Sequence, residues 1–250
     1  MLNKVLAAFI FFTRVPFGRL KVVPADTFKN IVAYWPIAGW LTSGISVLCL
    51  YLFMYFFPYE VALLLAILSR VLVTGGLHED GLADFFDGFG GGSSRERILA
   101  IMKDSHIGSY GVMGLLFYFM LLYFSLKSLS PELAGAIMLS ADPIAKCISG
   151  WIINILPYAR KETEAKNKTV YSRMTLREKV ILVLGGALPL LWLPDPRLLW
   201  ALLAPLSVFL FLVNLYKRKI DGYTGDCCGA TCLLCELSFY LAAVVVLTVC

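Results

Sequence analysis

Long apolar runs separated by short polar connections dominate the 250-residue chain. A helix needs about 20 apolar residues to cross a bilayer. Five runs have that length: Ile31–Phe57, Ile107–Leu126, Leu133–Pro157, Leu198–Tyr216 and Leu233–Cys250. Two shorter runs are Val61–Leu77, which carries Arg70, and Val180–Leu193, which either spans with little tilt or forms a shallow hairpin with the next run. The pattern predicts an all-α, polytopic membrane bundle of about seven transmembrane helices.

The N-terminal apolar segment is shorter than the predicted spans. Its apolar stretch Val5–Phe12 is too short to span, and Arg14 and Pro16 follow it where a signal peptide would have small residues before a cleavage site. We therefore expect Leu2–Phe12 to form an interfacial or re-entrant helix.

The composition agrees with a membrane domain. Hydrophobic residues make up 59% of the chain and charged residues 16%, whereas soluble domains are roughly 45–50% apolar and about 25% charged. A compact soluble domain, a disordered chain and a small disulfide scaffold are thereby excluded. The runs are too long and too evenly apolar for a transmembrane barrel. One membrane-embedded domain over residues 1–250 is expected.

Basic residues predict the orientation, because cytoplasmic loops of membrane proteins are enriched in Lys and Arg. With a cytoplasmic N-terminus and seven spans, 18 of the 22 basic residues fall on cytoplasmic segments, and only Lys127 and Arg197 fall outside. We therefore expect a multi-pass protein of the cell (inner) membrane with an active site facing the cytoplasm. The net charge of +5 is this sidedness signal, so no nucleic-acid partner is needed.

The densest group of acids lies in the glycine-rich stretch of residues 75–92. Asp80, Asp84 and Asp87 are spaced i, i+4, i+7 and would share one face of a helix, while Glu79 points off that face. Like charges at this spacing repel, and a hard cation such as Mg²⁺ would neutralise them. Residues 88–92 would let the backbone approach a ligand closely. The alternative is a solvated acidic loop.

Basic residues follow the acids closely. Arg95 and Arg97 could bind phosphate or anchor the cytoplasmic surface, whereas Lys103 and Asp104 lie nearer the start of a span and look more specific.

The two histidines of the chain, His78 and His106, flank the acidic stretch. Either could act as a base or a hydrogen-bond donor, and a structural role is the alternative. The cluster of cysteines at 227–235 lacks the facing pairs and the histidine that a zinc site needs.

Three further polar features remain ambiguous. Asp142 and Lys146 stand i, i+4 inside a span, where they form a buried ion pair or line a cleft. Arg160 ends that span as a phosphate clamp or an interfacial anchor. The turn at residues 221–226, with Thr224 and Asp226, could hold phosphate or metal, or be a plain turn.

Several of these stretches together resemble the cobalamin synthase family, adenosylcobinamide-GDP ribazoletransferase. The resemblance lies in GGLHEDGLADFFDGFGGG at 75–92, RILAIMKDSHIG at 97–108 and TGDCCGA at 224–230, together with FFTRVP at 11–16 and PYAR at 157–160. These motifs occur in order along the whole chain. At two positions the sequence departs from the family pattern: His106 stands where the family usually has Arg, and Asp221 where it has Gly.

The resemblance implies the last assembly step of cobalamin synthesis. The ribose hydroxyl of α-ribazole, or of its 5′-phosphate, attacks the phosphate attached to the cobinamide of adenosylcobinamide-GDP, and GMP leaves. The family uses Mg²⁺. Expected metal ligands are Asp80, Asp84, Asp87 and Glu79. Expected catalytic residues are His78, Asp104 and Asp226. Expected phosphate-binding residues are Arg95, Lys103, Arg160 and Thr224.

Two alternatives belong to other classes. A CDP-alcohol phosphatidyltransferase would share the D-G-x-x-A core at Asp80–Ala83, but Leu77 and Asp84 stand where that enzyme needs Asp and Arg. A divalent-cation transporter would need acids along a path within the spans, where only Asp142 and Glu236 occur. The partners expected are adenosylcobinamide-GDP, α-ribazole or its 5′-phosphate and the lipid bilayer, with a second copy of the chain, in a homo-oligomer, as a further candidate.

Overall fold

The computed structural model describes residues 1–160 and 170–249, and within them the chain is helical, as predicted. Its α-helices are α1 (Leu2–Phe12), α2 (Trp35–Phe53), α3 (Tyr59–Thr74), α4 (Leu77–Gly91), α5 (Arg95–Ile101), α6 (Ser109–Lys127), α7 (Pro131–Gly150), α8 (Ile152–Ile155), α9 (Leu176–Ala187), α10 (Leu203–Ile220) and α11 (Gly225–Val249). Lys161, Lys166 and Lys168, which the orientation argument places inside, and Cys250 lie outside the described residues.

Among the described residues, five helical stretches are long and apolar enough to cross a membrane. They are Val32–Phe53, Ser109–Lys127, Pro131–Ile155, Pro196–Ile220 and Gly225–Thr248. The pair α3 and α4, bent by 90° at their junction, adds a sixth if it is one broken span. A multi-pass membrane protein is thereby indicated, but the expected count of seven is not confirmed.

The missing span is the shortest predicted run, Val180–Leu193. Its helix α9 has 12 residues and continues as a 3₁₀ segment, Leu188–Trp192, that contains Pro189. Twelve α-helical residues rise about 18 Å, well short of a hydrocarbon core of about 30 Å. Proline cannot donate the backbone hydrogen bond that would continue the α-helix. Residues 176–192 therefore form a short α-helix beside α7, followed by a 3₁₀ segment, and not one regular membrane-spanning helix.

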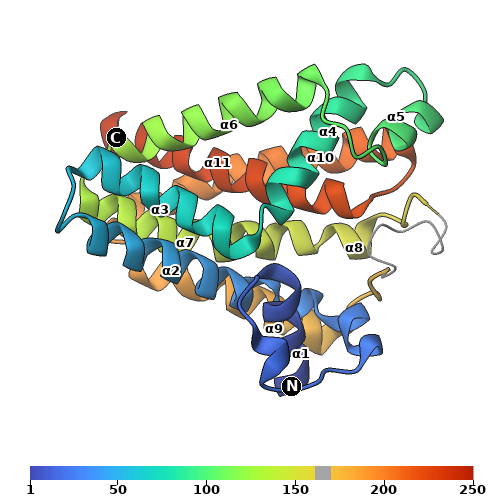
Figure 1. The fold of residues 1–250 in the computed structure, drawn as a ribbon, viewed down its shortest axis with the longest axis horizontal. Coiled ribbons are helices and arrows are strands. Elements are labelled where there is room, and N and C mark those ends of the chain that lie inside the picture. The colour runs from blue at the N-terminus through green and yellow to red at the C-terminus, as the bar shows by residue number, and fades with distance from the viewer. Residues whose placement is uncertain (161–169, 250) are drawn as a thin grey trace.

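The long helices lie roughly along one axis, with α7 and α11 inside the bundle (Figure 1). Helix α2 packs on α7 and α3, and α11 packs on α4, α7 and α10. The most apolar windows of α7 and α11 are 72% and 61% buried, against 28% for both α6 and the stretch containing α10. The two outer helices carry exposed large side chains that suit contact with lipid: Leu116, Phe117, Phe124, Leu210 and Phe211.

A sharp turn at Gly75 and Gly76 redirects the chain from α3 into the acidic helix α4. Both glycines have positive φ, +69° and +71°, a conformation that side chains with a Cβ rarely adopt. The segment after α1 is tied to this turn, because the Arg14 backbone N–H donates to the Val73 carbonyl at 2.7 Å. The turn therefore brings the start of α4 beside the end of α1.

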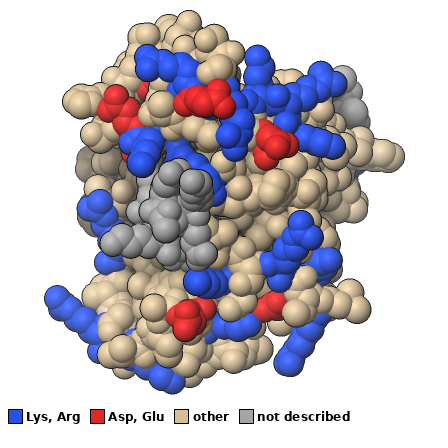
Figure 2. Space-filling model, turned by 90° about the vertical axis from the view of Figure 1, so that its right-hand side faces the viewer, with Lys and Arg blue, Asp and Glu red and all other residues tan. Residues whose placement is uncertain are grey.

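Helix α5 and the α10–α11 junction lie at the right-hand end of Figure 1. These segments carry five basic residues, Arg95, Arg97, Lys217, Arg218 and Lys219, and this end of the bundle is called the basic end. Figure 2 looks onto this end and shows many Lys and Arg side chains with few acids between them. The structure links the segments concerned, since the Arg95 guanidinium donates to the carbonyls of Ala159 and Ile220. Three motifs that are far apart in sequence thus meet at the basic end.

Candidate active site

A partly enclosed pocket opens at the basic end, where the end of α1 and the starts of α2, α4 and α11 converge. It penetrates as far as α7 in the middle of the bundle. Its lining residues are Phe11, Phe12, Trp35, Leu77, His78, Asp80, Gly81, Lys146, Ser149, Tyr158, Arg160, Tyr171, Tyr223, Gly225, Asp226, Cys228, Gly229 and Cys232. Acids, bases and six aromatic rings therefore share one cavity.

Two of the sequence motifs are hydrogen-bonded to each other at the mouth. The Ala159 N–H donates to the Tyr223 carbonyl at 2.8 Å, and the Tyr223 N–H donates to the Pro157 carbonyl at 2.9 Å. This short parallel bridge brings Arg160 to 3.9 Å from the carboxylate of Asp226, with both side chains almost fully buried. A second bond, from Arg160 to the Leu99 carbonyl at 3.1 Å, fixes the guanidinium. The Arg160 side chain is thus held in the pocket wall by these contacts and does not anchor the protein surface.

Helices α4 and α11 touch backbone to backbone beside this pair. An added Cβ at Gly81 would lie 3.1 Å from the Cα and the carbonyl oxygen of Asp226, and one at Gly229 would lie 3.4 Å from the Cα of His78. The approach is tight at Gly81, where an added Cβ would force a shift of a few tenths of an ångström, whereas at Gly229 it would make an ordinary contact. The contact places Asp80, Asp226 and Arg160 around the same cavity, although they come from three separate stretches of sequence.

The four acids predicted as metal ligands do not converge. Asp87 faces the start of α6, where its carboxylate accepts the N–H groups of Gly108 at 2.7 Å and Gly111 at 2.8 Å. Glu79 is buried beside Arg70 at 4.0 Å. Asp84 is half-buried one turn after Asp80, but it is not among the residues that line the pocket.

The pocket nonetheless offers a donor set for a hard cation. No group of three or more His, Cys, Asp or Glu side chains able to hold a metal occurs within residues 1–160 and 170–249. Mg²⁺, however, commonly uses one or two carboxylates and completes its shell with substrate phosphates and water. Asp80 and Asp226 fit that smaller role, because both line the cavity and carry carboxylate oxygens.

The predicted phosphate-binding residues divide between two places. Arg95, Lys103 and Arg160 border a second, open depression together with Glu96 and Leu99. Arg160 belongs to both cavities, so the depression adjoins the pocket.

Thr224 lies behind the pocket rather than in its lining. Its hydroxyl lies 3.4 Å from the carboxylate of Asp226 and accepts the Cys227 N–H at 3.3 Å. Thr224 therefore supports Asp226 from behind.

The two histidines have different surroundings. His78 is buried in the pocket wall, where its ring stacks on Phe12 at 5.4 Å with the planes 8° apart. His106 is exposed and pairs with Asp104 at 2.7 Å. Hydrogen bonds from His106 lower the pKa of the exposed Asp104 carboxyl. Of the three predicted catalytic residues, His78 and Asp226 line the pocket and Asp104 does not.

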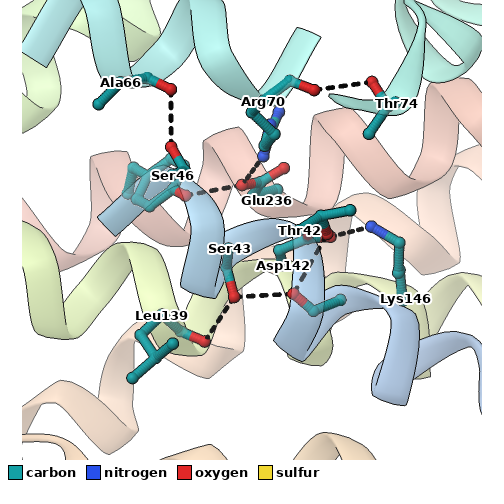
Figure 3. A network of polar contacts seen from close by, with 12 residues as sticks. Thr42, Ser43, Ser46, Ala66, Arg70, Thr74, Leu139, Asp142, Lys146 and Glu236 are labelled. Atoms are coloured by element: carbon teal, nitrogen blue, oxygen red, sulfur yellow. Dashed lines mark hydrogen bonds and ion pairs between the residues drawn. The ribbon is translucent and has the colours of Figure 1, made fainter. Parts of the chain in front are cut away.

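Two buried ion pairs lie in the interior (Figure 3). Arg70 on α3 pairs with Glu236 on α11 and donates to the Tyr118 hydroxyl at 2.9 Å. Asp142 pairs with Lys146 one turn along α7 and accepts the Thr42 hydroxyl at 2.5 Å. The buried ion pair predicted for these two residues is confirmed, and Lys146, but not Asp142, also lines the pocket.

The aromatic wall of the pocket was not predicted. Phe12, Trp35 and Tyr171 come from three segments and meet edge to face, with ring centroids 5.5 Å apart for Phe12 and Trp35 and 5.3 Å apart for Trp35 and Tyr171. In a chain with 14% aromatic residues, nothing in the sequence distinguishes these rings from lipid-facing ones. Burial raises the pKa of Tyr158, Tyr171 and Tyr223 above the ordinary value of a phenol.

The fold and the pocket define a polytopic helical membrane protein with a charged, aromatic-walled cavity at its basic end. A family model described as Cobalamin-5-phosphate synthase matches residues 4–244, and the chain belongs to that family. The family resemblance found from the motifs is confirmed.

Curated relatives cover nearly the whole chain. A protein of Shewanella sp. (strain W3-18-1) named Adenosylcobinamide-GDP ribazoletransferase is 37% identical over 244 residues, covering 96% of this chain and 93% of its own. A protein of the same name from Shewanella baltica (strain OS185) is 36% identical with the same coverage. Another, from Shewanella oneidensis, is 36% identical over 239 residues, covering 94% of this chain and 91% of its own. No solved structure matches the chain.

Proposed function

We propose that the protein transfers the adenosylcobinamide phosphate group of adenosylcobinamide-GDP to α-ribazole or α-ribazole 5′-phosphate. The products are adenosylcobalamin, or its 5′-phosphate, and GMP. Family membership and the names of the relatives support this reaction. The single structural observation that carries it is the grouping of the buried Arg160 and Asp226 with the more exposed Asp80 in one pocket, because phosphoryl transfer needs cations and oxygen ligands around one phosphate.

The reaction exchanges one phosphorus–oxygen bond for another. The ribose hydroxyl attacks the phosphorus that carries the cobinamide, the bond to the bridging oxygen breaks, and GMP departs with that oxygen. Arg160 would bind the phosphate oxygens through its fixed guanidinium. His78 in the pocket wall, or Asp226, would accept the hydroxyl proton. Asp104 does not line the pocket and pairs with the exposed His106, so it is assigned no step of the reaction.

A divalent cation has a place in this proposal. Asp80 and Asp226 would hold Mg²⁺, which when bound would neutralise charge that develops on the pyrophosphate as GMP leaves. Arg95 and Lys103 in the adjoining depression would contact the phosphates of the nucleotide half, and Thr224 would keep Asp226 in place.

The orientation of the protein in the membrane is proposed from the distribution of basic residues. The basic end of the bundle, onto which the pocket opens, is proposed to face the cytoplasm of a cell (inner) membrane. Soluble nucleotide substrates would then reach the pocket directly.

The alternatives are not favoured. Family membership disfavours a CDP-alcohol phosphatidyltransferase. A cation transporter would need acids that line a path, yet Asp142 and Glu236 are committed to Lys146 and Arg70.

The proposal is tested with purified protein in detergent, adenosylcobinamide-GDP and α-ribazole, by measuring GMP release with and without Mg²⁺. Asp80→Asn should reduce GMP release at least 100-fold and remove its response to Mg²⁺. Asp26→Asn, a change of an exposed aspartate outside the pocket, is the matched control and should leave the rate unchanged. Full GMP release by the Asp80→Asn variant would refute the assignment.

A further inference from the structure

We propose that the aromatic wall of the pocket is the subsite for the planar base of the acceptor nucleoside, and that the Trp35 indole N–H hydrogen-bonds the free ring nitrogen of that base. The inference rests on the proposed function, because it takes the acceptor to be α-ribazole. It adds what neither the family nor the relatives' names specify, which is the place of the acceptor and the residue that selects it.

The wall has the shape and chemistry of a ring-binding surface. Trp35 at the start of α2 meets Tyr171 and Phe12 edge to face, and Phe11 meets Tyr171 at 6.0 Å. These rings come from segments that are remote in sequence, yet all four line the pocket. Flat, rigid side chains supply a large contact area for an aromatic ligand at a low entropic cost.

Trp35 supplies the second, independent observation. Its side chain is 3% exposed, and its Nε1 finds no hydrogen-bond acceptor among the described residues. Buried indole N–H groups usually have a partner, because a donor removed from water without one costs free energy. Of the buried side-chain nitrogen and oxygen atoms without a partner in the described part of the chain, only this one belongs to a residue lining the pocket. A ligand that offers one acceptor would satisfy it.

The base of the acceptor nucleoside has one hydrogen-bond acceptor to match the one unpaired donor of Trp35. A benzimidazole bonded to ribose through one nitrogen keeps one other ring nitrogen, which is an acceptor and not a donor. The rest of the base is apolar and suits the aromatic wall. Guanine, the base of the other substrate, has several donors and acceptors on its edges and would leave them unpaired against Phe11, Phe12 and Trp35. The wall therefore favours the acceptor nucleoside over the nucleotide half.

The subsite also gives the acceptor a direction. The aromatic wall and the Asp80–Asp226–Arg160 grouping line the same cavity. A base held against Trp35 and Tyr171 would leave its ribose hydroxyl toward the carboxylates and the guanidinium. Such positioning of a nucleophile is one of the large contributions available to catalysis of group transfer.

The experiment combines a variant with a ligand change. Trp35→Phe keeps an aromatic ring and removes the N–H. Trp40→Phe is the matched control, because the Trp40 N–H donates to the Gly185 carbonyl at 3.0 Å outside the pocket. Binding of α-ribazole to the purified protein is measured by calorimetry without the second substrate, and KM is measured for each substrate in the GMP-release assay.

We expect Trp35→Phe to raise the Kd and KM for α-ribazole about tenfold, the effect of one lost hydrogen bond. The KM for adenosylcobinamide-GDP should not change, and Trp40→Phe should leave all three values unchanged. In the unaltered protein, the indole analogue of α-ribazole, which has C–H in place of the acceptor nitrogen, should bind about tenfold more weakly than α-ribazole. Trp35→Phe should bind both ligands equally.

Each outcome decides one question. Equal binding of α-ribazole and its indole analogue by the unaltered protein would overturn the inference, even if Trp35→Phe fails to fold. A rise in the KM for adenosylcobinamide-GDP alone would assign the wall to guanine and also overturn it. Binding of α-ribazole with the expected pattern but without GMP release would refute the proposed function and leave the subsite standing.

Discussion

Gly81 of α4 lies directly against the backbone of Asp226 at the start of α11. A Cβ at position 81 would be 3.1 Å from both the Cα and the carbonyl oxygen of Asp226, which is closer than most such contacts. Because Asp80 precedes Gly81 on the same helix, this contact sets the position of one pocket carboxylate relative to the other. The absence of a side chain at Gly81 is thus a geometric condition of the site.

Gly81→Ala should therefore separate α4 from α11 by a few tenths of an ångström at the pocket. We expect kcat/KM for GMP release to fall about 10- to 100-fold, since small displacements of reacting groups have large effects on rate. Gly44→Ala on α2 is the control, because its added Cβ would meet no atom within 4 Å. Kinetics that are the same for both variants would show that this contact does not position the site.

Asp87 should matter for stability rather than for chemistry. Its carboxylate accepts two backbone N–H groups at the start of α6, so Asp87→Asn exchanges a charged acceptor for a neutral one that cannot satisfy both equally well. We expect a loss of about 1–3 kcal/mol of unfolding free energy, measured by thermal unfolding in detergent, with the Mg²⁺ response of the folded fraction unchanged. A lost Mg²⁺ response with unchanged stability would instead restore Asp87 as a metal ligand.

The Arg70–Glu236 pair should be costly to break on one side only. Arg70→Met would leave the Glu236 carboxylate buried without its cation, at a cost of about 3–5 kcal/mol. The double variant Arg70→Met/Glu236→Leu should recover part of that loss, because it removes the buried Glu236 charge, whereas Glu79, 4.0 Å from Arg70, loses its cation in both variants. Thermal unfolding of the single variants and the double variant gives the coupling directly. Additive losses would mean that the two charges do not stabilise each other.

The sequence predicts features that depend on local spacing. The long apolar runs predict the bundle, and the i, i+4 spacing of Asp142 and Lys146 predicts their contact. The Arg70–Glu236 pair joins residues 166 positions apart, and no local pattern indicates which helices face each other. The aromatic wall of Phe12, Trp35 and Tyr171 is hidden for the same reason.

The acidic helix shows where local spacing is insufficient. Asp80 and Asp87 do lie on α4, but the two ends of that helix have different neighbours. The N-terminal end of α4 packs on α11, and Asp80 there lines the pocket. The C-terminal half packs on α6, and the Asp87 carboxylate there accepts the N–H of Gly108 at the start of α6. Sequence periodicity predicts which residues share a helix face, whereas tertiary packing decides what each of them meets.

A pH-dependent contact holds α1, whose last residues line the pocket. Lys4 on α1 donates to the Glu178 carboxylate at 2.8 Å. Burial alone would raise the pKa of Glu178, but hydrogen bonds from Lys4 and Thr175 outweigh it and lower the pKa below its usual value. A carboxyl whose pKa is lower in the folded state adds stability above its unfolded pKa, and that contribution disappears as the pH falls through the folded pKa.

Lys4→Met should consequently cost up to about 1 kcal/mol at pH 7, because the pair is partly exposed and screened by solvent. The difference from the unaltered protein should shrink as the pH falls below the ordinary pKa of glutamate, since a protonated Glu178 no longer attracts the ammonium. Thermal unfolding in detergent between pH 7 and pH 3.5 measures this difference. Lys127→Met is the comparison variant, and it should cost less at pH 7 because Lys127 and its partner Glu60 are both more exposed and lie 3.9 Å apart. A cost of Lys4→Met that grows toward acid pH would contradict the lowered pKa of Glu178. A contact that depends on the ionised carboxylate must weaken when Glu178 takes up a proton.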